Sequence, residues 1–119
     1  MDGWHGILQQ ALQSLSENPD RRTATMFMHG TLKVMLYTPK GSDPQVPHDR
    51  DEIYIVVSGN GRFRLGDNTF RFKVGDVIFV PSGAEHRFED FSDDLAAWVM
   101  FYGPPGGEIE SELTHKNGD

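Results

Sequence analysis

The stretch GDVIFVPSGAEHRFED, residues 75–90, decides the fold. Its apolar run Val77–Val80 has the composition of a short strand. The strand stops at Pro81-Ser82-Gly83, because proline cannot donate to a strand ladder and glycine accepts turn conformations. A second strand begins directly after this turn with His86. The stretch therefore predicts two strands joined by a tight turn, with a histidine at the head of the second.

The same pattern of short β-rich runs and turn residues continues on both sides of this stretch. Gly66-Asp67-Asn68, for example, has the composition of a hairpin turn that needs positive φ. The predicted strands cover residues 23–29, 32–38, 52–57, 62–65, 69–72, 77–80, 86–90 and 96–102. Many short strands at even spacing indicate an all-β barrel or sandwich.

The two ends of the chain differ from this β-rich centre. Apolar residues between Ile7 and Leu15 recur at spacings of three and four, which predicts a short amphipathic helix that ends at Asn18-Pro19. The end of the chain is rich in Gly and Pro and then acidic, so we expect it to be flexible. The predicted organisation is a helical extension over 1–22, a barrel over 23–103 and a flexible tail over 104–119.

Composition excludes several classes of function. The 119 residues suffice for one domain and include no cysteine, so disulfides, thiolate metal sites and a cysteine nucleophile are excluded. The formal net charge of −7 argues against a nucleic-acid partner. No apolar run approaches the ~20 residues needed to cross a membrane, and the first ten residues do not resemble a secretory signal. We therefore expect a cytoplasmic protein.

The strand predicted over residues 52–57 is apolar on both faces. Glu52, Tyr54 and Val56 share one face, and Ile53, Ile55 and Val57 share the other. One face would line the barrel interior. The other could be covered by the N-terminal helix, a second sheet or a partner subunit, and a homodimer is the interpretation we favour.

Large apolar residues elsewhere are of the kind that fill a barrel. The set expected to line its interior is Phe27, Phe63, Phe79, Phe88, Trp98 and Met100. Any cavity left among them would be small and suited to a small organic molecule with one or two metal-binding oxygens.

Three polar side chains are placed to converge in such a barrel. His48 and Glu52 are four residues apart, so in extended chain they project to the same side. His86 opens another strand of the same barrel. Two histidines and one carboxylate form a facial set of three ligands that leaves other coordination positions open. Each also has a simpler explanation: a solvated loop residue for His48, an ion pair with an arginine for Glu52, and a hydrogen-bonded core residue for His86.

Residues 41–90 resemble the paired motifs of the cupin superfamily, and in particular its small single-domain members of the conserved-barrel (cupin 2) type. The first family motif ends in His-x-His, three or four residues, Glu, six residues and Gly. Here Val46-Pro47-His48 is followed by three residues, Glu52, six residues and Gly59. The second motif is Gly, five residues, Pro-x-Gly, two residues, His, three residues and Asn. The stretch 75–90 matches it at every spacing and ends in Asp90 where the motif has Asn.

The resemblance implies a double-stranded β-helix, or jelly-roll (cupin) barrel, with a short N-terminal helix. It also implies that His48, Glu52 and His86 bind one divalent metal ion, which the ligand set does not identify among Fe, Mn, Zn, Ni and Cu. The first histidine of the motif is replaced by Val46, so the usual fourth ligand is missing. Gln45 is the candidate for its replacement, although a loop glutamine is usually only a turn residue.

The function implied by the resemblance is metal-dependent chemistry on a small organic molecule. Cupins include dioxygenases, isomerases, decarboxylases and lyases, and the fold does not choose among them. Tyr54 and Asp90 are candidates for a catalytic role, with core packing and turn capping as their alternatives. The alternative function is a non-enzymatic module that binds a small molecule or is purely structural, with a degenerate metal site.

Overall fold

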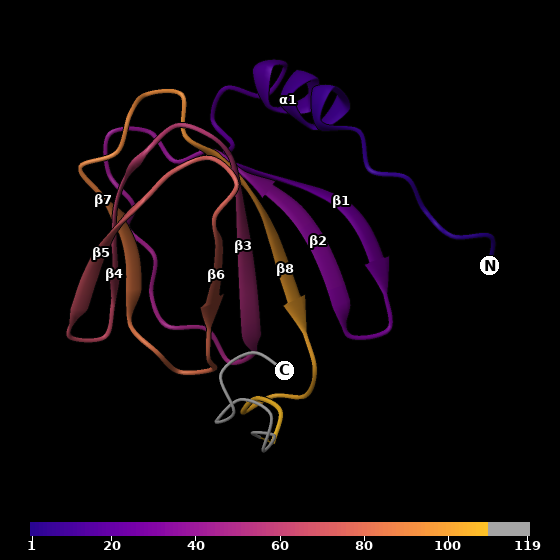
Figure 1. Ribbon diagram of the computed structural model, residues 1–119. Coiled ribbons are helices and arrows are strands. Elements are labelled where there is room, and N and C mark those ends of the chain that lie inside the picture. The colour runs from indigo at the N-terminus through magenta and orange to yellow at the C-terminus, as the bar shows by residue number, and fades with distance from the viewer. Residues whose placement is uncertain (110–119) are drawn as a thin grey trace.

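The computed structural model describes residues 1–109 and consists mainly of two antiparallel sheets that face one another (Figure 1). The larger sheet has the strand order β1-β2-β8-β3-β6, and the smaller has the order β5-β4-β7. The strands are β1 Thr23–His29, β2 Leu32–Tyr37, β3 Asp51–Ser58, β4 Gly61–Leu65, β5 Asn68–Phe72, β6 Val77–Val80, β7 His86–Glu89 and β8 Ala96–Tyr102. This is the all-β jelly-roll barrel that the sequence predicted.

The observed strands lie close to the predicted ones. Strand β3 begins one residue earlier than expected, at Asp51, and β7 ends one residue earlier, at Glu89. The early end of β7 follows from the backbone of Asp90, which has a positive φ of 48° and so turns the chain away from the strand. The turn between β4 and β5 is also as predicted, with Gly66 at a φ of 59°.

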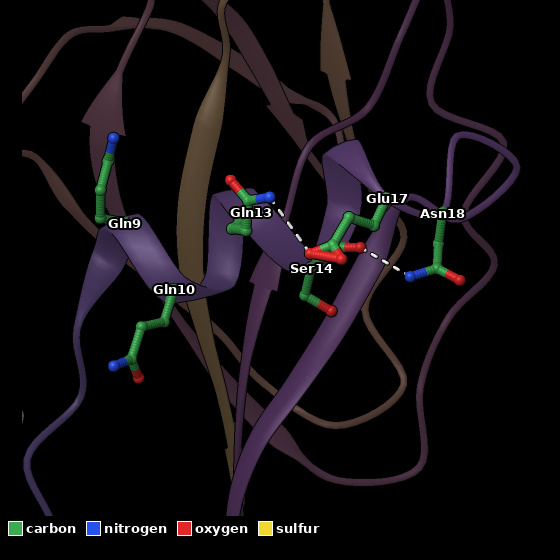
Figure 2. Close-up of a pocket in the computed structure, with 6 residues that line it drawn as sticks. All are labelled: Gln9, Gln10, Gln13, Ser14, Glu17 and Asn18. Carbon is green, nitrogen blue, oxygen red and sulfur yellow. Dashed lines mark hydrogen bonds between the residues drawn. The ribbon is translucent and has the colours of Figure 1, made fainter.

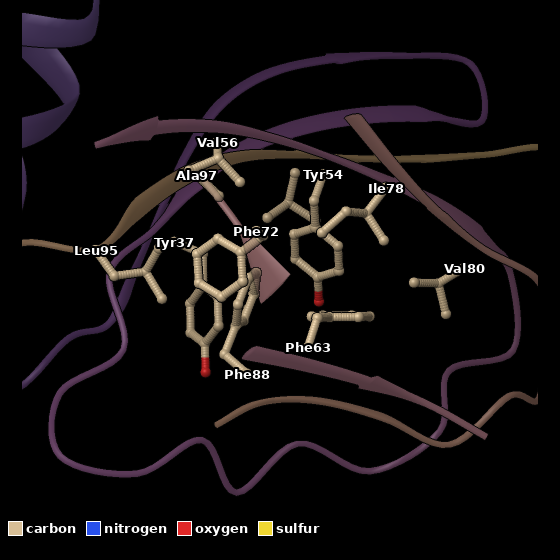
Figure 3. Close-up of a cluster of buried hydrophobic side chains, with 11 residues drawn as sticks. Tyr37, Tyr54, Val56, Phe63, Phe72, Ile78, Val80, Phe88, Leu95 and Ala97 are labelled. Carbon is tan, nitrogen blue, oxygen red and sulfur yellow. The ribbon is translucent and has the colours of Figure 1, made fainter. Parts of the chain in front are cut away.

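The inner faces of the two sheets meet in an aromatic core (Figure 3). Tyr54 of β3 lies between Phe63 of β4 and Phe88 of β7, with ring centroids 5.7 and 5.0 Å away in edge-on arrangements. Such edge-to-face contacts suit the charge distribution of aromatic rings. Around these rings are further buried apolar side chains: Tyr37, Val56, Phe72, Ile78, Val80, Leu95, Ala97 and Val99.

The expectation for the barrel lining was correct only for Phe63 and Phe88. Phe79 is 47% exposed, because its strand neighbours Ile78 and Val80 occupy the inner positions. Strand alternation likewise turns Trp98 and Met100 of β8 to the outer face, and Phe27 stacks on Trp4 outside the barrel. These strands have apolar residues at both odd and even positions, so the sequence alone did not separate the residues that face inward from those that face outward.

Helix α1, Leu8–Ser16, covers one part of the outer face of the larger sheet. Its Ala11 and Leu15 are buried against residues of β1, β2 and β8: Ala24, Leu36 and Ala96. The opposite face of the helix is polar, as Figure 2 shows, and there Gln13 donates a hydrogen bond to Glu17 over 3.2 Å. Within residues 1–109, no helix is long and apolar enough to cross a membrane.

The segment after β8, where a flexible tail is expected over 104–119, makes hydrogen bonds at its beginning. The N–H of Gly106 donates to the Asp49 carbonyl over 2.7 Å, and the N–H of Glu108 donates to the Asp51 carboxylate over 2.8 Å. The beginning of the tail is therefore hydrogen-bonded to the start of β3. The rest of the predicted tail, residues 110–119, lies outside the described residues.

Candidate metal centre

The structure brings His48, Glu52 and His86 together between the two sheets. Glu52 lies on the inner face of β3 in the larger sheet, and His86 begins β7 in the smaller sheet. His48 comes from the loop before β3. One donor atom from each residue lies within 4.8 Å of the others, so the three side chains are near enough to hold one metal ion together.

The turn at residues 81–83 also helps to place His48. The N–H of Gly83 donates to the His48 carbonyl over 2.7 Å, so the turn holds the backbone of the loop before β3. The His48 ring packs edge-on against Phe101 of β8, with centroids 5.1 Å apart, and lies 5.0 Å from the ring of His86. The turn before His86 and the loop before Glu52 are therefore joined at the site.

The donor atoms of Glu52 and His86 are buried and unsatisfied. The two side chains are 1% and 0% exposed, and His86 Nε2 lies 3.1 Å from Glu52 Oε1. This is an ion-pair distance, although the two atoms form no hydrogen bond. Both Glu52 oxygens and His86 Nε2 therefore lack a hydrogen-bond partner among the described residues. Because a buried carboxylate without a partner is costly, the arrangement fits a cation at this position.

The orientation of His86 is fixed from its other nitrogen. Nδ1 lies 3.0 Å from the Ala84 carbonyl and donates to it, so Nε2 is the ring nitrogen that faces Glu52. Burial lowers the pKa of His86, but the Glu52 carboxylate and the Ala84 carbonyl raise it by more, so the net shift is upward. In the metal-free protein the His86 imidazole is therefore more readily protonated than a free imidazole.

Gln45 lies beside the three residues and is held by a buried carboxylate. Its Nε2 donates to Asp43 Oδ2 over 2.7 Å. Its Oε1 accepts a hydrogen bond from the Tyr54 hydroxyl over 3.0 Å and lies 3.3 Å from His48 Nε2. Asp43, which is 3% exposed, also accepts from the Tyr37 hydroxyl and from the Phe88 N–H over 2.9 Å.

Sequence reasoning missed Asp43. It belongs to a loop rich in Pro, Gly and Asp, where an aspartate is usually a turn residue. Only the folding of this loop onto the edge of β7 makes its carboxylate a buried acceptor. No local pattern signals such a contact between residues 43 and 88.

Of the two catalytic candidates, Tyr54 lies next to the site and Asp90 lies away from it. Tyr54 is fully buried, and burial together with the charge of Glu52 raises its pKa well above the usual value, so its hydroxyl stays protonated. Asp90 follows the other end of β7, where its exposed carboxylate pairs with Arg62.

A cavity of about 240 Å³ lies beside the site. Gln45 and His86 of the site line it, and the remaining lining residues are Val46, Pro47, Arg64, Glu85 and Arg87. The cavity is smaller than the ~300–1,000 Å³ of typical ligand pockets. It therefore has room only for a small molecule.

Comparison with known proteins agrees with this architecture. A family model described as a cupin domain matches residues 33–102, which run from β2 to the end of β8. An uncharacterized protein of Streptomyces coelicolor, SCO3923, is 41% identical over 63 residues, which cover 53% of this chain and 60% of that protein. The acireductone dioxygenase of Drosophila pseudoobscura pseudoobscura is 38% identical over 64 residues, which cover 49% of this chain and 34% of the enzyme. The matches thus span less than two thirds of these relatives.

Solved structures show the same fold at low sequence identity. The cupin domain of Cnp3 from Schizosaccharomyces pombe superposes with a TM-score of 0.62 at 17% identity, covering 69% of this chain and 60% of that one. KdgF from Halomonas sp. superposes with a TM-score of 0.61 at 19% identity, covering 69% of this chain and 79% of that one. At these identities the likeness concerns the fold alone.

Proposed function

Because the chain belongs to the cupin family, we propose that it holds one divalent metal ion with His48, Glu52 and His86 and binds a small organic molecule there. The observation that carries the proposal is the set of buried donor atoms on Glu52 and His86 that have no hydrogen-bond partner among residues 1–109. A cation shared with His48 would satisfy them. Two imidazoles and one carboxylate form a ligand set that suits Fe(II) and leaves positions open for other ligands.

A divalent ion bound there would polarise an oxygen atom of the substrate that coordinates it. The chain's own residues prepare the site for this chemistry. Ala84 orients His86 through Nδ1, and the buried rings of Tyr54 and Phe63 exclude water from the inner side. The small cavity beside His86 and Gln45 provides the space for a ligand of a few heavy atoms.

Metal analysis tests the proposal. We expect the untagged protein to contain close to one divalent ion per chain by elemental analysis, and His86→Ala to lose it. His29→Ala is the matched control, because His29 is exposed at the end of β1. Protein that contains no metal and takes up none of Fe, Mn, Ni, Cu or Zn after chelator treatment would rule out this function.

Dioxygenase chemistry is the form of activity that the comparisons favour, since acireductone dioxygenases are among the relatives. The test is oxygen uptake by the iron-loaded protein when an acireductone is added, with His86→Ala as the blank. Uptake that depends on His86 would support an enzyme. A protein that retains its metal without uptake would favour the alternative, a binding module without catalytic activity.

We also propose that the outer face of the larger sheet is covered by a second copy of the chain. Val77 and Phe79 on the edge strand β6 are 66% and 47% exposed. Ile53 and Ile55 of β3 pair with them and are only half-buried. Helix α1 does not reach this part of the sheet, and an apolar face of this kind is typical of an interface.

A further inference from the structure

We propose that the side-chain oxygen of Gln45 is a fourth protein ligand of the metal site, and that Asp43 presets it for this role. The inference rests on the metal function proposed above and concerns a residue outside the family's motif. It also gives the site a replacement for the ligand that is lost where this chain has Val46 in place of the motif's first histidine.

The hydrogen bonds of Asp43 determine which end of the Gln45 amide faces the site. A carboxylate only accepts, so the group 2.7 Å from Asp43 Oδ2 must be the NH₂ of Gln45. Asp43 is held in turn by the N–H of Phe88 and by the hydroxyl of Tyr37, whose pKa is raised by burial and by the contact with Asp43. The Gln45 oxygen is therefore fixed toward Tyr54 and His48.

The side-chain oxygen of Gln45 and Nε2 of His48 can lie this close only if a proton or a cation lies between them. Gln45 Oε1 and His48 Nε2 are 3.3 Å apart. In the metal-free protein an N–H on Nε2 donates to the oxygen. When Nε2 acts as a metal ligand it has no proton, and two lone pairs would face one another at this distance. Two neighbouring ligands, each about 2.1 Å from one ion, are about 3 Å apart, so a shared ion replaces the proton without a large movement.

The hydroxyl of Tyr54 completes the arrangement. It donates to the same oxygen over 3.0 Å. An amide oxygen has two lone pairs. One lone pair of the Gln45 oxygen accepts the hydrogen bond from Tyr54, and the other is directed at His48. The oxygen is therefore oriented by two groups on its own chain before any ion binds.

This ligand set alters the metal preference of the site. Two nitrogens and two oxygens replace the three histidines and one glutamate implied by the full motif. Oxygen ligands suit Mn(II), whereas imidazole suits Zn(II), Cu(II) and Ni(II). We therefore expect Gln45 to contribute more to Mn(II) affinity than to Zn(II) affinity.

The test is calorimetric titration of chelator-treated protein with Mn(II) and, separately, with Zn(II). We compare the wild type with Gln45→Ala and with Gln45→Met, which keeps the length of the side chain and lacks the oxygen. Gln13→Ala is the matched control, because Gln13 is exposed on α1. We expect both Gln45 variants to weaken Mn(II) binding at least tenfold and Zn(II) binding less. We expect Asp43→Asn to weaken Mn(II) binding about tenfold, as for other groups that orient a ligand.

Two further readouts separate ligation from a structural role. Thermal unfolding shows whether each variant folds, and the Met variant carries the test if the Ala variant does not. The visible spectrum of the Co(II)-loaded protein reports its ligands and should change in the Gln45 variants but not in Gln13→Ala. Folded Gln45 variants with wild-type Mn(II) affinity and spectrum would overturn this inference and leave the three-residue site standing. A wild type that binds no metal would overturn both proposals.

Discussion

Asp51 shows how one buried side chain holds several parts of the chain in place. It precedes Glu52 on β3 and is 5% exposed. Its Oδ1 accepts from the N–H of Ser82 over 2.9 Å, and its Oδ2 accepts from the N–H of Glu108 over 2.8 Å. One carboxylate therefore connects the turn before His86 with the start of the C-terminal segment.

We expect Asp51→Ala to lower the free energy of unfolding by about 3 kcal/mol, because two N–H groups lose a charged acceptor. Asp49→Ala is the control, since its side chain is exposed and only its carbonyl is a hydrogen-bond acceptor here. Urea denaturation of both variants provides the comparison. Equal midpoints would show that the Asp51 contacts do not contribute to stability.

The three proposed metal ligands were predictable from sequence because their spacing is local or belongs to a motif. Extended-chain spacing of four residues predicted that His48 and Glu52 project to the same side, although His48 lies in the loop before β3. The turn pattern of residues 75–90 identifies His86. Asp43 was not predictable, since its role depends on a loop contact with Phe88 across 45 positions. The sequence indicates Gln45 only as a neighbour of the motif, because the orientation of its side chain depends on that same Asp43.

At the scale of elements, α1 and the strand positions were predictable, whereas the choice of faces was not. Helical spacing and breaker residues fix α1, and turn residues fix the strands to within about one residue. Strands β3, β6 and β8 have apolar residues at both odd and even positions, so alternation alone does not show which side chains face the barrel interior. The aromatic core and the contacts of α1 decide it, and both are tertiary contacts.

The packing of α1 leads to a prediction for that element. Leu15→Ala removes a buried side chain from the contact with β1, β2 and β8. We expect a loss of about 2–3 kcal/mol in the free energy of unfolding, the lower part of the range for buried leucines. Gln10→Ala, on the exposed face of the same helix, should be near neutral. Similar losses in the two variants would mean that α1 does not stabilise the sheet through this face.

For the whole molecule, the distribution of charge matters as much as the fold. The chain has a net charge of −7, so two copies repel one another over most approaches. Two rows of residues across the outer face of the larger sheet are uncharged. One is Val34, Met100, Ile53 and Phe79; the other is Leu36, Trp98, Ile55 and Val77, of which Leu36 and Trp98 pack against α1. This face is where two copies can meet with the least repulsion.

We expect Val77→Lys to convert the proposed dimer to a monomer, because a charge would enter an apolar interface. The variant should retain its unfolding midpoint at low concentration, since Val77 is exposed in the single chain. Met28→Lys, at the opposite edge of the sheet and 65% exposed, is the control. Sedimentation velocity measures the result. A monomeric wild type would contradict the dimer.

Metal binding should also act on the stability of the entire chain, because the unsatisfied atoms of Glu52 and His86 lie inside it. An ion that binds only the folded state stabilises it by about 2.7 kcal/mol when free metal is 100 times the dissociation constant. For a domain of this size, that corresponds to a rise of roughly 10 °C in the melting temperature. Differential scanning calorimetry with and without metal measures it.

Glu52→Leu separates this effect from non-specific binding of metal. The substitution removes a buried carboxylate that makes no hydrogen bond among residues 1–109. It leaves no stranded charge, because without Glu52 the burial of His86 favours its neutral form, so the metal-free variant should melt no lower than the metal-free wild type. It also removes a ligand, so added metal should no longer raise its melting temperature. If metal stabilised the variant as much as the wild type, the stabilising ion would be bound elsewhere. If metal-free Glu52→Leu melted far lower, the carboxylate would have a structural role of its own.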